Sequence, residues 1–356
     1  MRIRPTSMIA AAAFLVPFLA EAETIAIVAP QTGAYAMLGG QILQGARAAA
    51  EATGHTALAL DEPCEAETHT DLVARMREAD AVAAVGFLCT ETLSTLMPAL
   101  AEAGIPALTV AVRSDILMED ALREQWPLFR MAPGEDDEAQ AISQTVLERW
   151  KAESVAIIDD GTIYGRELAS AIRETIEQGG ISPVFVDTYR PGQEQQVALV
   201  RRLSKAGATH LIVGGDRNDV SVIARDAGAE GIPLTILAGD TMRAANRPVP
   251  LREGILTAAL PDYSELPSAS DVTASLRSAN LEPDGYTLPA YAAIEIVAAA
   301  LSGEESQSLA ARLVGREFGT VLGPVEFDAG QQLVQNPFRL QQWKGGRFVT
   351  VAPLTE

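Results

Sequence analysis

The stretch ADAVAAVGFLCTETLSTLMPALAEAGIPALTV, residues 79–110, decides the fold class. A continuous apolar run near its start predicts a buried strand, residues 92–103 predict a helix, and a second apolar run follows. Gly104 ends the helix, and Pro106 begins the next strand, where its missing N–H is tolerated. Two apolar strands joined by a helix indicate a parallel sheet that is covered on both faces.

The same unit recurs later in the chain. Val213-Gly214 closes another strand, a helix follows, and Gly231-Ile232-Pro233 leads into the next strand. Chance reuse of a common connector is one explanation, and duplication of a whole lobe is the other. The shared order and the nearly equal offset of the two glycines favour a duplicated lobe.

Short apolar runs alternate with helical stretches along the chain. We expect strands over 24–29, 57–61, 81–87, 107–110, 154–158, 184–187, 210–213, 234–237 and 254–258. We expect helices over 41–52, 70–79, 92–103, 139–150, 164–178, 193–206, 219–227, 288–301 and 308–317. The sequence therefore predicts an α/β fold of two doubly wound parallel-sheet lobes, with a cleft between them and ligand contacts just beyond the carboxyl ends of the strands.

Length and charge narrow the possible functions. A chain of 356 residues suggests two domains, and 48% apolar residues can form full cores. The formal net charge of −20 argues against nucleic acid and anionic lipid as partners. We expect a monomer that binds a small molecule and needs no cofactor.

The first 22 residues have the features of a secretory signal. A basic start at Arg2 and Arg4 precedes an apolar stretch over 8–20 that is too short to span a membrane, and Ala20 and Ala22 supply the small residues of a cleavage site. We expect cleavage after Ala22. No cysteine follows the signal, so we expect no lipid anchor, and an exported protein without one favours the periplasm.

The chain has two cysteines, Cys64 and Cys89. The periplasm is oxidising, so the pair predicts one disulfide, with two buried free thiols as the alternative. A metal site at His69, near Glu62 and Glu65, is disfavoured because the ligand spacing matches no familiar site.

An enzyme is also disfavoured. The sequence has no Gly-x-Ser-x-Gly elbow and no phosphate-binding loop, and its three histidines are scattered. Asp159 and Asp160 are adjacent, so on a strand end they point to opposite sides. The acidic run over 135–138 is typical of a helix N-terminus.

Several segments resemble the leucine/isoleucine/valine-binding protein family, the periplasmic receptors of amino-acid ABC importers. IAIVAPQTGAYAMLGGQILQG resembles the family's first strand, turn and helix, and the cysteine pair resembles its disulfide. The remaining similar segments are AIIDDGTIYGREL (156–168), Val213-Gly214-Gly215, Gly239-Asp240 and VLGPVEFD (321–328).

The resemblance implies a ligand site. It places the ligand's carboxylate at Thr90, Ala111 and Arg113, where a hydroxyl and free backbone N–H groups favour an anion. It places the ligand's ammonium at Asp240, an acid in a partly dry cleft.

Two positions depart from the family pattern, and each site residue also has a structural explanation. Arg113 stands where a small hydroxyl residue is common, and Asp216 where a tyrosine is common, so a polar, charged or non-amino-acid ligand fits as well as a branched-chain amino acid. Thr90 and Asp216 could cap helices, and Arg113 could pair with Asp115 or Glu119. Tyr164 is expected at the cleft wall, with a place on the edge of the lobe 2 core as the alternative.

These features together predict the periplasmic substrate-binding component of an ABC importer, which binds an amino-acid-like or other small carboxylate ligand and docks on permease subunits. The alternative is a periplasmic sensor that signals to a membrane receptor. The family implies three interlobe crossings, expected near 131–133, 260–263 and 334–337. Lobe 1 would then comprise 23–130 and 261–335, and lobe 2 would comprise 131–260 and 336–356.

Overall fold

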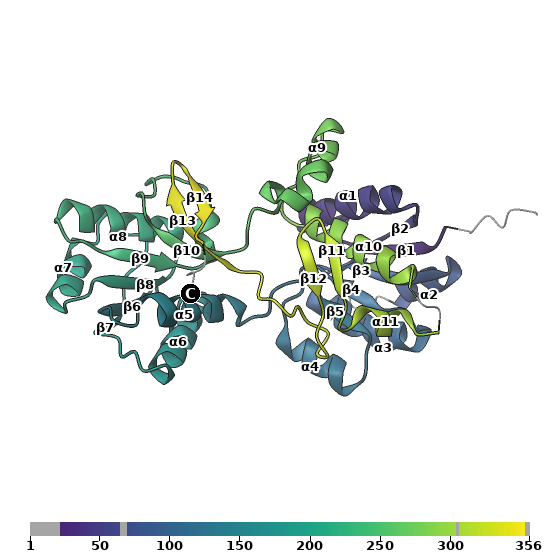
Figure 1. Ribbon diagram of the computed structural model, residues 1–356, viewed down its shortest axis with the longest axis horizontal. Helices are drawn as coiled ribbons and strands as arrows, with labels where there is room; N and C mark the ends of the chain where they lie inside the picture. Colours follow the sequence, from purple (N-terminus) through teal and green to yellow (C-terminus); the bar gives the residue numbers. More distant parts are fainter. Residues whose placement is uncertain (1–21, 65–69, 304–305, 353–356) are drawn as a thin grey trace, which may run out of the picture.

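The computed structural model describes residues 22–64, 70–303 and 306–352. It has two α/β lobes that are joined by three chain segments (Figure 1). Residues 1–21 of the expected signal lie outside the described residues. In the described part of the chain, no helix combines the length and the apolar character that a membrane crossing requires.

Five parallel strands form the sheet of lobe 1, in the order β2-β1-β3-β4-β5. Side chains of β1 alternate between the two faces: Ile25 and Ile27 join one apolar cluster, and Ala26 and Val28 join the other. The sheet is thus buried on both faces, as the continuous apolar runs predicted. Its strands are β1 (Thr24–Ala29), β2 (Thr56–Asp61), β3 (Ala81–Gly86), β4 (Ala107–Thr109) and β5 (Leu128–Arg130).

Helices cover both faces of this sheet (Figure 1). On one face α1 packs against α10, and a Cβ on Gly45 would overlap the Thr287 carbonyl, so this glycine permits the close approach. The helices are α1 (Ala36–Thr53), α2 (Thr70–Glu78), α3 (Thr90–Ala103), α4 (Asp115–Arg123), α9 (Ser270–Ser278), α10 (Thr287–Leu301) and α11 (Leu309–Leu313). A hairpin of β11 (Glu317–Thr320) and β12 (Gly323–Glu326) completes the lobe.

Lobe 2 has a seven-stranded sheet in the order β14-β13-β10-β9-β8-β6-β7. Its parallel strands are β6 (Val155–Asp159), β7 (Phe185–Thr188), β8 (His210–Gly214), β9 (Thr235–Ala238) and β10 (Leu256–Ala259). Its helices are α5 (Asp137–Arg149), α6 (Ile163–Gln178), α7 (Val197–Lys205) and α8 (Arg217–Ala229). Val155 and Ile157 pack on one face, and Ala156 and Ile158 pack on the other, so this lobe is doubly wound as well.

The edge of lobe 2 differs from the prediction. β13 (Arg339–Lys344) pairs antiparallel with β10, and β14 (Arg347–Thr350) pairs antiparallel with β13. The sheet is therefore mixed, with an antiparallel edge that comes from the end of the chain. β14 is the edge strand and β13 lies beside it, only partly buried, so both carry many polar side chains and no continuous apolar run marks them.

The glycine connectors behave as predicted in both lobes. Gly104 and Gly231 each have φ of 69°, a left-handed conformation that glycine adopts without a Cβ penalty, and each precedes a strand of the parallel sheet. The helix predicted over 308–317 is wrong in its second half. α11 ends at Leu313, and Gly315 (φ 65°) donates its backbone N–H to the Phe327 carbonyl, which turns the chain into β11.

Three segments carry the chain between the lobes (Figure 1). They lie between β5 and α5, between β10 and the 3-10 turn η2 (Tyr263–Glu265), and between β12 and β13. Their positions agree with a three-segment hinge, whereas the residue at which each lobe begins stays a prediction.

Candidate functional site

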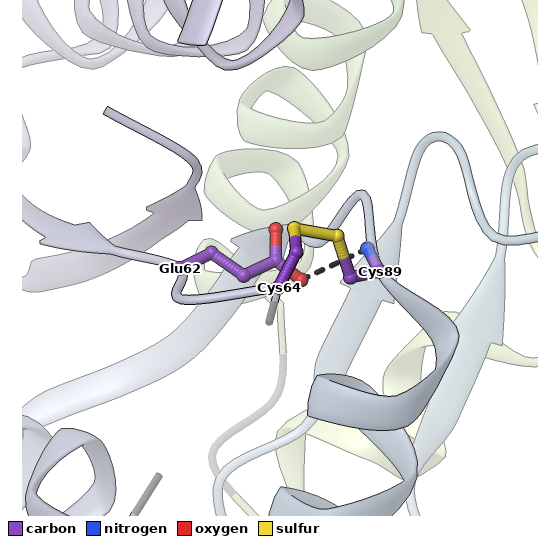
Figure 2. A group of neighbouring side chains, drawn as sticks. All are labelled: Glu62, Cys64 and Cys89. Atoms are coloured by element: carbon purple, nitrogen blue, oxygen red, sulfur yellow. Dashed lines mark hydrogen bonds between the residues drawn. A yellow bond between two sulfur atoms is a disulfide. The ribbon is translucent and has the colours of Figure 1, made fainter. Parts of the chain in front are cut away.

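In lobe 1 the predicted disulfide is present and lies beside a buried carboxylate (Figure 2). Cys64 and Cys89 have Cα atoms 5.5 Å apart. Glu62 is 1% exposed and accepts the backbone N–H groups of Leu88 (2.8 Å) and Cys89 (3.0 Å), directly before α3. Burial raises the pKa of Glu62 to about 7, against the opposing effect of these two hydrogen bonds.

The disulfide leaves no sulfur free to hold a metal. Among the described residues, Glu62, Cys64 and Cys89 are the only group whose side chains lie close enough together to bind a metal ion. The two sulfur atoms of this group are bonded to each other. His69 and Glu65, the other candidates for a metal site, lie outside the described residues.

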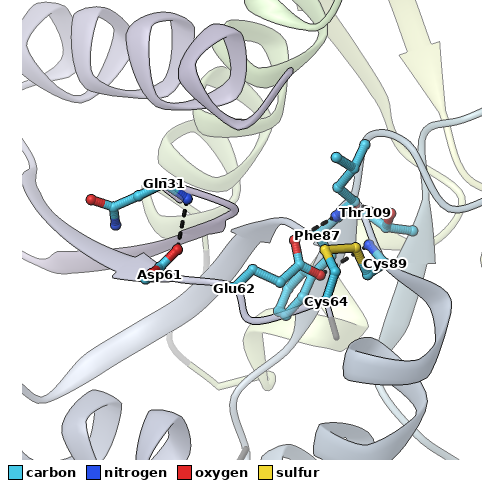
Figure 3. The surroundings of a disulfide bond; sticks show 8 residues. Gln31, Asp61, Glu62, Cys64, Phe87, Cys89 and Thr109 are labelled. Atoms are coloured by element: carbon cyan, nitrogen blue, oxygen red, sulfur yellow. Dashed lines mark hydrogen bonds between the residues drawn. A yellow bond between two sulfur atoms is a disulfide. The ribbon is translucent and has the colours of Figure 1, made fainter. Parts of the chain in front are cut away.

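Thr90 is the first residue of α3, and Cys89 occupies the cap position. The helix-cap explanation for Thr90 is therefore wrong. Backbone N–H groups in the first turn of a helix lack intrahelical acceptors, so this end of α3 can accept an anion. The Ala111 backbone N–H, by contrast, is directed at the Thr109 hydroxyl at 3.3 Å, and that hydroxyl donates to the Phe87 carbonyl. Thr109 and Phe87 belong to the surroundings of the disulfide (Figure 3).

Arg113 reaches from lobe 1 toward the crossing segments. Its Nη2 donates to the Gly134 carbonyl at 3.0 Å, and its guanidinium lies 5.9 Å from the centre of the Phe338 ring. Asp115, considered above as a partner of Arg113, instead pairs with Arg130 at 2.6 Å. No salt bridge joins Arg113 to Glu119 within the residues that the structure describes, so the surface-pair explanation fails.

In lobe 2 a glutamate joins two of the predicted site residues. Glu138, near the start of α5, is 5% exposed, and its Oε1 accepts the Tyr164 hydroxyl (2.8 Å) and the Asp240 backbone N–H (2.6 Å). A Cβ on Gly239 would overlap both Glu138 Oε1 and the Tyr164 hydroxyl, so a glycine is needed there. We call Glu138, Tyr164 and Asp240 the acidic cluster.

The charges of this acidic cluster interact with Arg113. Burial raises the pKa of Glu138 and of Asp240, and the negative charge of Asp240 raises that of Glu138 further. The positive charges of Arg243 and Arg113 oppose this rise in the pKa of Asp240, and that of Arg113 opposes the rise in the pKa of Glu138. Burial and the neighbouring Glu138 raise the pKa of Tyr164, so its hydroxyl stays a donor although 36% of the residue is exposed.

A cavity of about 310 Å³ lies against Asp240 and is lined by both lobes. Asp240 and Arg243 line it from lobe 2, and the segment before α10 lines it from lobe 1. The sequence prediction missed that segment. Its Pro283-Asp284-Gly285 turn is a recognisable signal, and Gly285 has φ of 51° there.

Asp216 stands apart from the acidic cluster. It is exposed and caps α8, where its Oδ1 accepts the Asn218 backbone N–H at 2.7 Å. The helix-cap explanation is confirmed for this residue. Of the six predicted site residues, the structure therefore joins Tyr164 and Asp240 through Glu138, and it leaves Thr90, Ala111, Arg113 and Asp216 outside the acidic cluster.

Glu138 is the site residue that the sequence prediction missed. Residues 135–138 were assigned only to a helix N-terminus, and α5 does begin at Asp137. Glu135 and Asp136 are exposed as that assignment implies, but Glu138 is buried. The sequence did carry a signal for this burial. Residues three or four apart on a helix share a face, and Glu138 precedes the buried Ile142 by four.

Two α/β lobes with polar side chains facing each other at a hinge define a two-lobed solute-binding protein. The periplasmic binding protein family model matches residues 23–347, and the chain belongs to that family. The family is one of solute-binding proteins and not of enzymes.

Individual relatives agree with the resemblance found in the sequence. The chain is 26% identical to the Leu/Ile/Val-binding protein homolog 3 of Brucella melitensis, over 92% of each chain. The fold is similar to an ABC transporter substrate-binding protein from Desulfitobacterium hafniense in complex with Leu (TM-score 0.66, 20% identity, 93% of this chain and 100% of that one). It is also similar to a solute-binding protein of an ABC transporter from R. palustris in complex with benzoate (TM-score 0.60, 19% identity, 93% and 96%). The predicted membership in the leucine/isoleucine/valine-binding protein family is confirmed.

Proposed function

We propose that this protein is the substrate-binding component of an ABC importer, and that it captures a small amino-acid-like or carboxylate ligand between its lobes. The observation that carries the proposal is the cavity between the lobes, which Asp240 and Arg243 line from lobe 2 and Asp284 lines from lobe 1. A ligand held by groups of both lobes stabilises the closed form over the open form. The closed form would then dock on the permease.

The proposed contacts divide by charge. Asp240 and Tyr164 would meet a cationic or hydrogen-bonding group of the ligand, and Arg113 would meet its carboxylate. Thr90 and Ala111 would extend the anion subsite in lobe 1, and Asp216 would extend the polar wall of lobe 2. Relatives in complex with Leu and with benzoate support both ligand classes, because one ligand carries an ammonium group and the other does not.

We further propose that the protein works in the periplasm as a monomer, after signal cleavage following Ala22. The periplasmic family and the disulfide support export. The mass of the protein in a periplasmic extract tests this: a chain beginning at Glu23 is expected, and an uncleaved chain in the cytoplasm would contradict it. The relatives described above are named as binding proteins of amino acids or of ABC transporters, which favours an importer over a sensor.

Thermal shifts test the binding function. The chain from Glu23, with its disulfide formed, is screened against amino acids, carboxylates, amides and polyols. A ligand at 100 times its dissociation constant should stabilise the protein by about 2.7 kcal/mol. Loss of the shift in Asp240→Ala, but not in the exposed Asp271→Ala control, would support the site.

The two ligand classes give different results in the same screen. An amino-acid ligand should depend on Asp240, whereas a carboxylate without an ammonium should depend on Arg113 and not on Asp240. Shifts that survive both substitutions would refute this site.

A further inference from the structure

A second cavity, of about 220 Å³, lies at the hinge, and we call it the hinge pocket. All three crossing segments line it: Met131 comes from the first, Pro261 from the second and Val334 from the third. Its walls also come from both lobes, since Glu317 of β11 lines it from lobe 1 and Thr350 of β14 lines it from lobe 2. A rotation of one lobe against the other therefore changes the shape of this pocket.

The hinge pocket shares a wall with the cavity between the lobes, the interlobe cavity. Pro261 and Tyr263 line both, so the second crossing segment lies between them. Burial raises the pKa of Tyr263 to about 12; the positive charge of Arg339 opposes this rise, and the negative charge of Asp240 adds to it. Arg339 lines the hinge pocket and Asp240 lines the interlobe cavity, so charged groups of both act on the same hydroxyl.

The size and the lining of the hinge pocket indicate what it can hold. Most of the side chains around it are apolar, and the charged ones are Glu317, Glu326 and Arg339. Two acids against one base disfavour a carboxylate, which is the kind of group proposed for the cleft ligand. An apolar cavity of about 150 Å³ is large enough for benzene, whereas a protein partner needs a far larger surface. The hinge pocket therefore suits an uncharged molecule with a single ring.

The contacts across the hinge pocket set the direction of its effect. Tyr263 of η2 and Thr350 of β14 line it from the two lobes, and the same two elements are joined by an ion pair of Glu265 with Arg347 at 3.1 Å. The hinge pocket and the interlobe cavity lie on opposite sides of the second crossing segment. A rotation that narrows the cavity therefore moves η2 and β14 apart, and a molecule that contacts both would lose contacts.

The facing rims of the two lobes are exposed in this arrangement. Met37, near the start of α1, is 79% exposed, and Ile163, the first residue of α6, is 77% exposed. Both helices follow strands whose carboxyl ends border the cleft. We infer that the hinge pocket binds an uncharged molecule with a single ring, and that this molecule holds the lobes apart and so weakens binding of the ligand in the cleft. Only the effect on the cleft ligand rests on the proposed function.

Phenol is the probe for the hinge pocket, because it has one ring and is uncharged at neutral pH. Saturation-transfer NMR measures its binding to the full mature protein. Calorimetry measures the binding of leucine and of benzoate, without phenol and with phenol at about ten times its dissociation constant.

Three variants accompany the wild type. Val334→Trp fills the pocket from the third crossing segment, and Thr350→Trp fills it from β14. Val349→Trp is the matched control, because Val349 is exposed on β14 and does not line the pocket. Circular dichroism and the melting temperature check that each variant folds, and if one filling variant does not fold, the other decides.

We expect phenol to bind the wild type and Val349→Trp with a dissociation constant of about 1 mM, as its small size allows. Both filling variants should bind phenol about tenfold more weakly. Phenol should weaken the binding of leucine or benzoate to the wild type by about tenfold, and saturating cleft ligand should weaken phenol by the same factor, because coupling between two sites is reciprocal. In the filling variants the cleft ligand should bind more weakly even without phenol, and phenol should have no further effect.

Three results overturn the inference. If the filling variants bind phenol as the wild type does, or if phenol still competes with leucine in them, phenol does not act from the hinge pocket. If phenol occupies the pocket and leaves leucine and benzoate binding unchanged, the effect on the cleft fails. If neither of these nor any other ligand of the thermal-shift screen binds, the proposed function and the effect on the cleft fail together, whereas the variants still decide whether phenol occupies the hinge pocket.

Discussion

Each lobe buries one glutamate close to the carboxyl ends of its strands, and the two are held differently. In lobe 1, Glu62 accepts two backbone N–H groups beside a disulfide. In lobe 2, Glu138 accepts one backbone N–H and a side-chain hydroxyl, next to Asp240. The first arrangement fixes a turn of the backbone. The second includes a side-chain hydroxyl and lies next to Asp240, which lines the cavity between the lobes.

The largest difference between the lobes in the free energy of unfolding should come from the disulfide, which lies in lobe 1. Replacing Cys64 and Cys89 together by alanine opens a link between residues separated by 25 in sequence, and the expected loss in the free energy of unfolding is roughly 3 to 4 kcal/mol. Trp126 reports on lobe 1, and Trp150 and Trp343 report on lobe 2, in urea unfolding followed by the fluorescence of variants that keep the tryptophans of one lobe only. Only the lobe 1 transition should move; equal shifts of both would show that the lobes unfold as one unit.

The next effect is a pH dependence in lobe 1. The pKa of Glu62 is about 7 in the folded protein, above its ordinary value of 4.5, so the folded state holds a proton that the unfolded state has lost. Its stabilising contribution is complete below pH 4.5 and is lost as the pH rises through 7. Between pH 5 and 7 the loss should be about 2 kcal/mol. Glu62→Gln, measured by urea unfolding at each pH, should lack this decline; a parallel decline would assign it to other groups.

A smaller effect is expected from Gly239→Ala in lobe 2. The new Cβ would displace Glu138 and the Tyr164 hydroxyl, so the free energy of unfolding should fall by about 1 to 2 kcal/mol and ligand affinity should fall with it. Gly40→Ala in α1 is the matched change in lobe 1, where a Cβ meets no neighbour, and it should stabilise the helix by about 0.5 to 1 kcal/mol. If both variants changed the free energy of unfolding in the same direction, the explanation by packing around the new Cβ would be contradicted.

The smallest difference in stability is expected between one helix cap of lobe 2, Thr162, and one of lobe 1, Ser114. Thr162 accepts the Gly165 backbone N–H at 3.0 Å and also donates to Asp160, whereas Ser114 only accepts the Leu117 backbone N–H at 3.3 Å. Thr162→Ala should therefore cost about 1 kcal/mol and Ser114→Ala about 0.5 kcal/mol in thermal unfolding. The reverse order would show that the bond to Asp160 adds nothing.

The regular part of the fold could be predicted because buried parallel strands are apolar and uninterrupted. β1 was predicted at its observed bounds, Thr24–Ala29. β5 has only three residues, and β13 and β14 are polar strands at one side of the sheet, so no run of apolar residues marked them. The nine-residue helices α4 and α9 were missed as well.

The candidate site was less predictable than the fold. The order of the segments located Tyr164 and Asp240 near each other, because both follow strands of the same sheet. It could not locate Glu138, which precedes the first strand of lobe 2 and reaches the site by the packing of α5 against α6. It also could not show that Asp216 caps its own helix, because an acid at that position fits either role.

The pairing of β10 with β13 affects how the chain can fold as it is made. Ala259 lies opposite Arg339 in the sheet, and almost the whole second part of lobe 1 is synthesised between them. Until those residues have emerged, the edge of β10 has no neighbour and exposes unpaired backbone groups. The sheet of lobe 2 is thus completed last, although its first strands are made early.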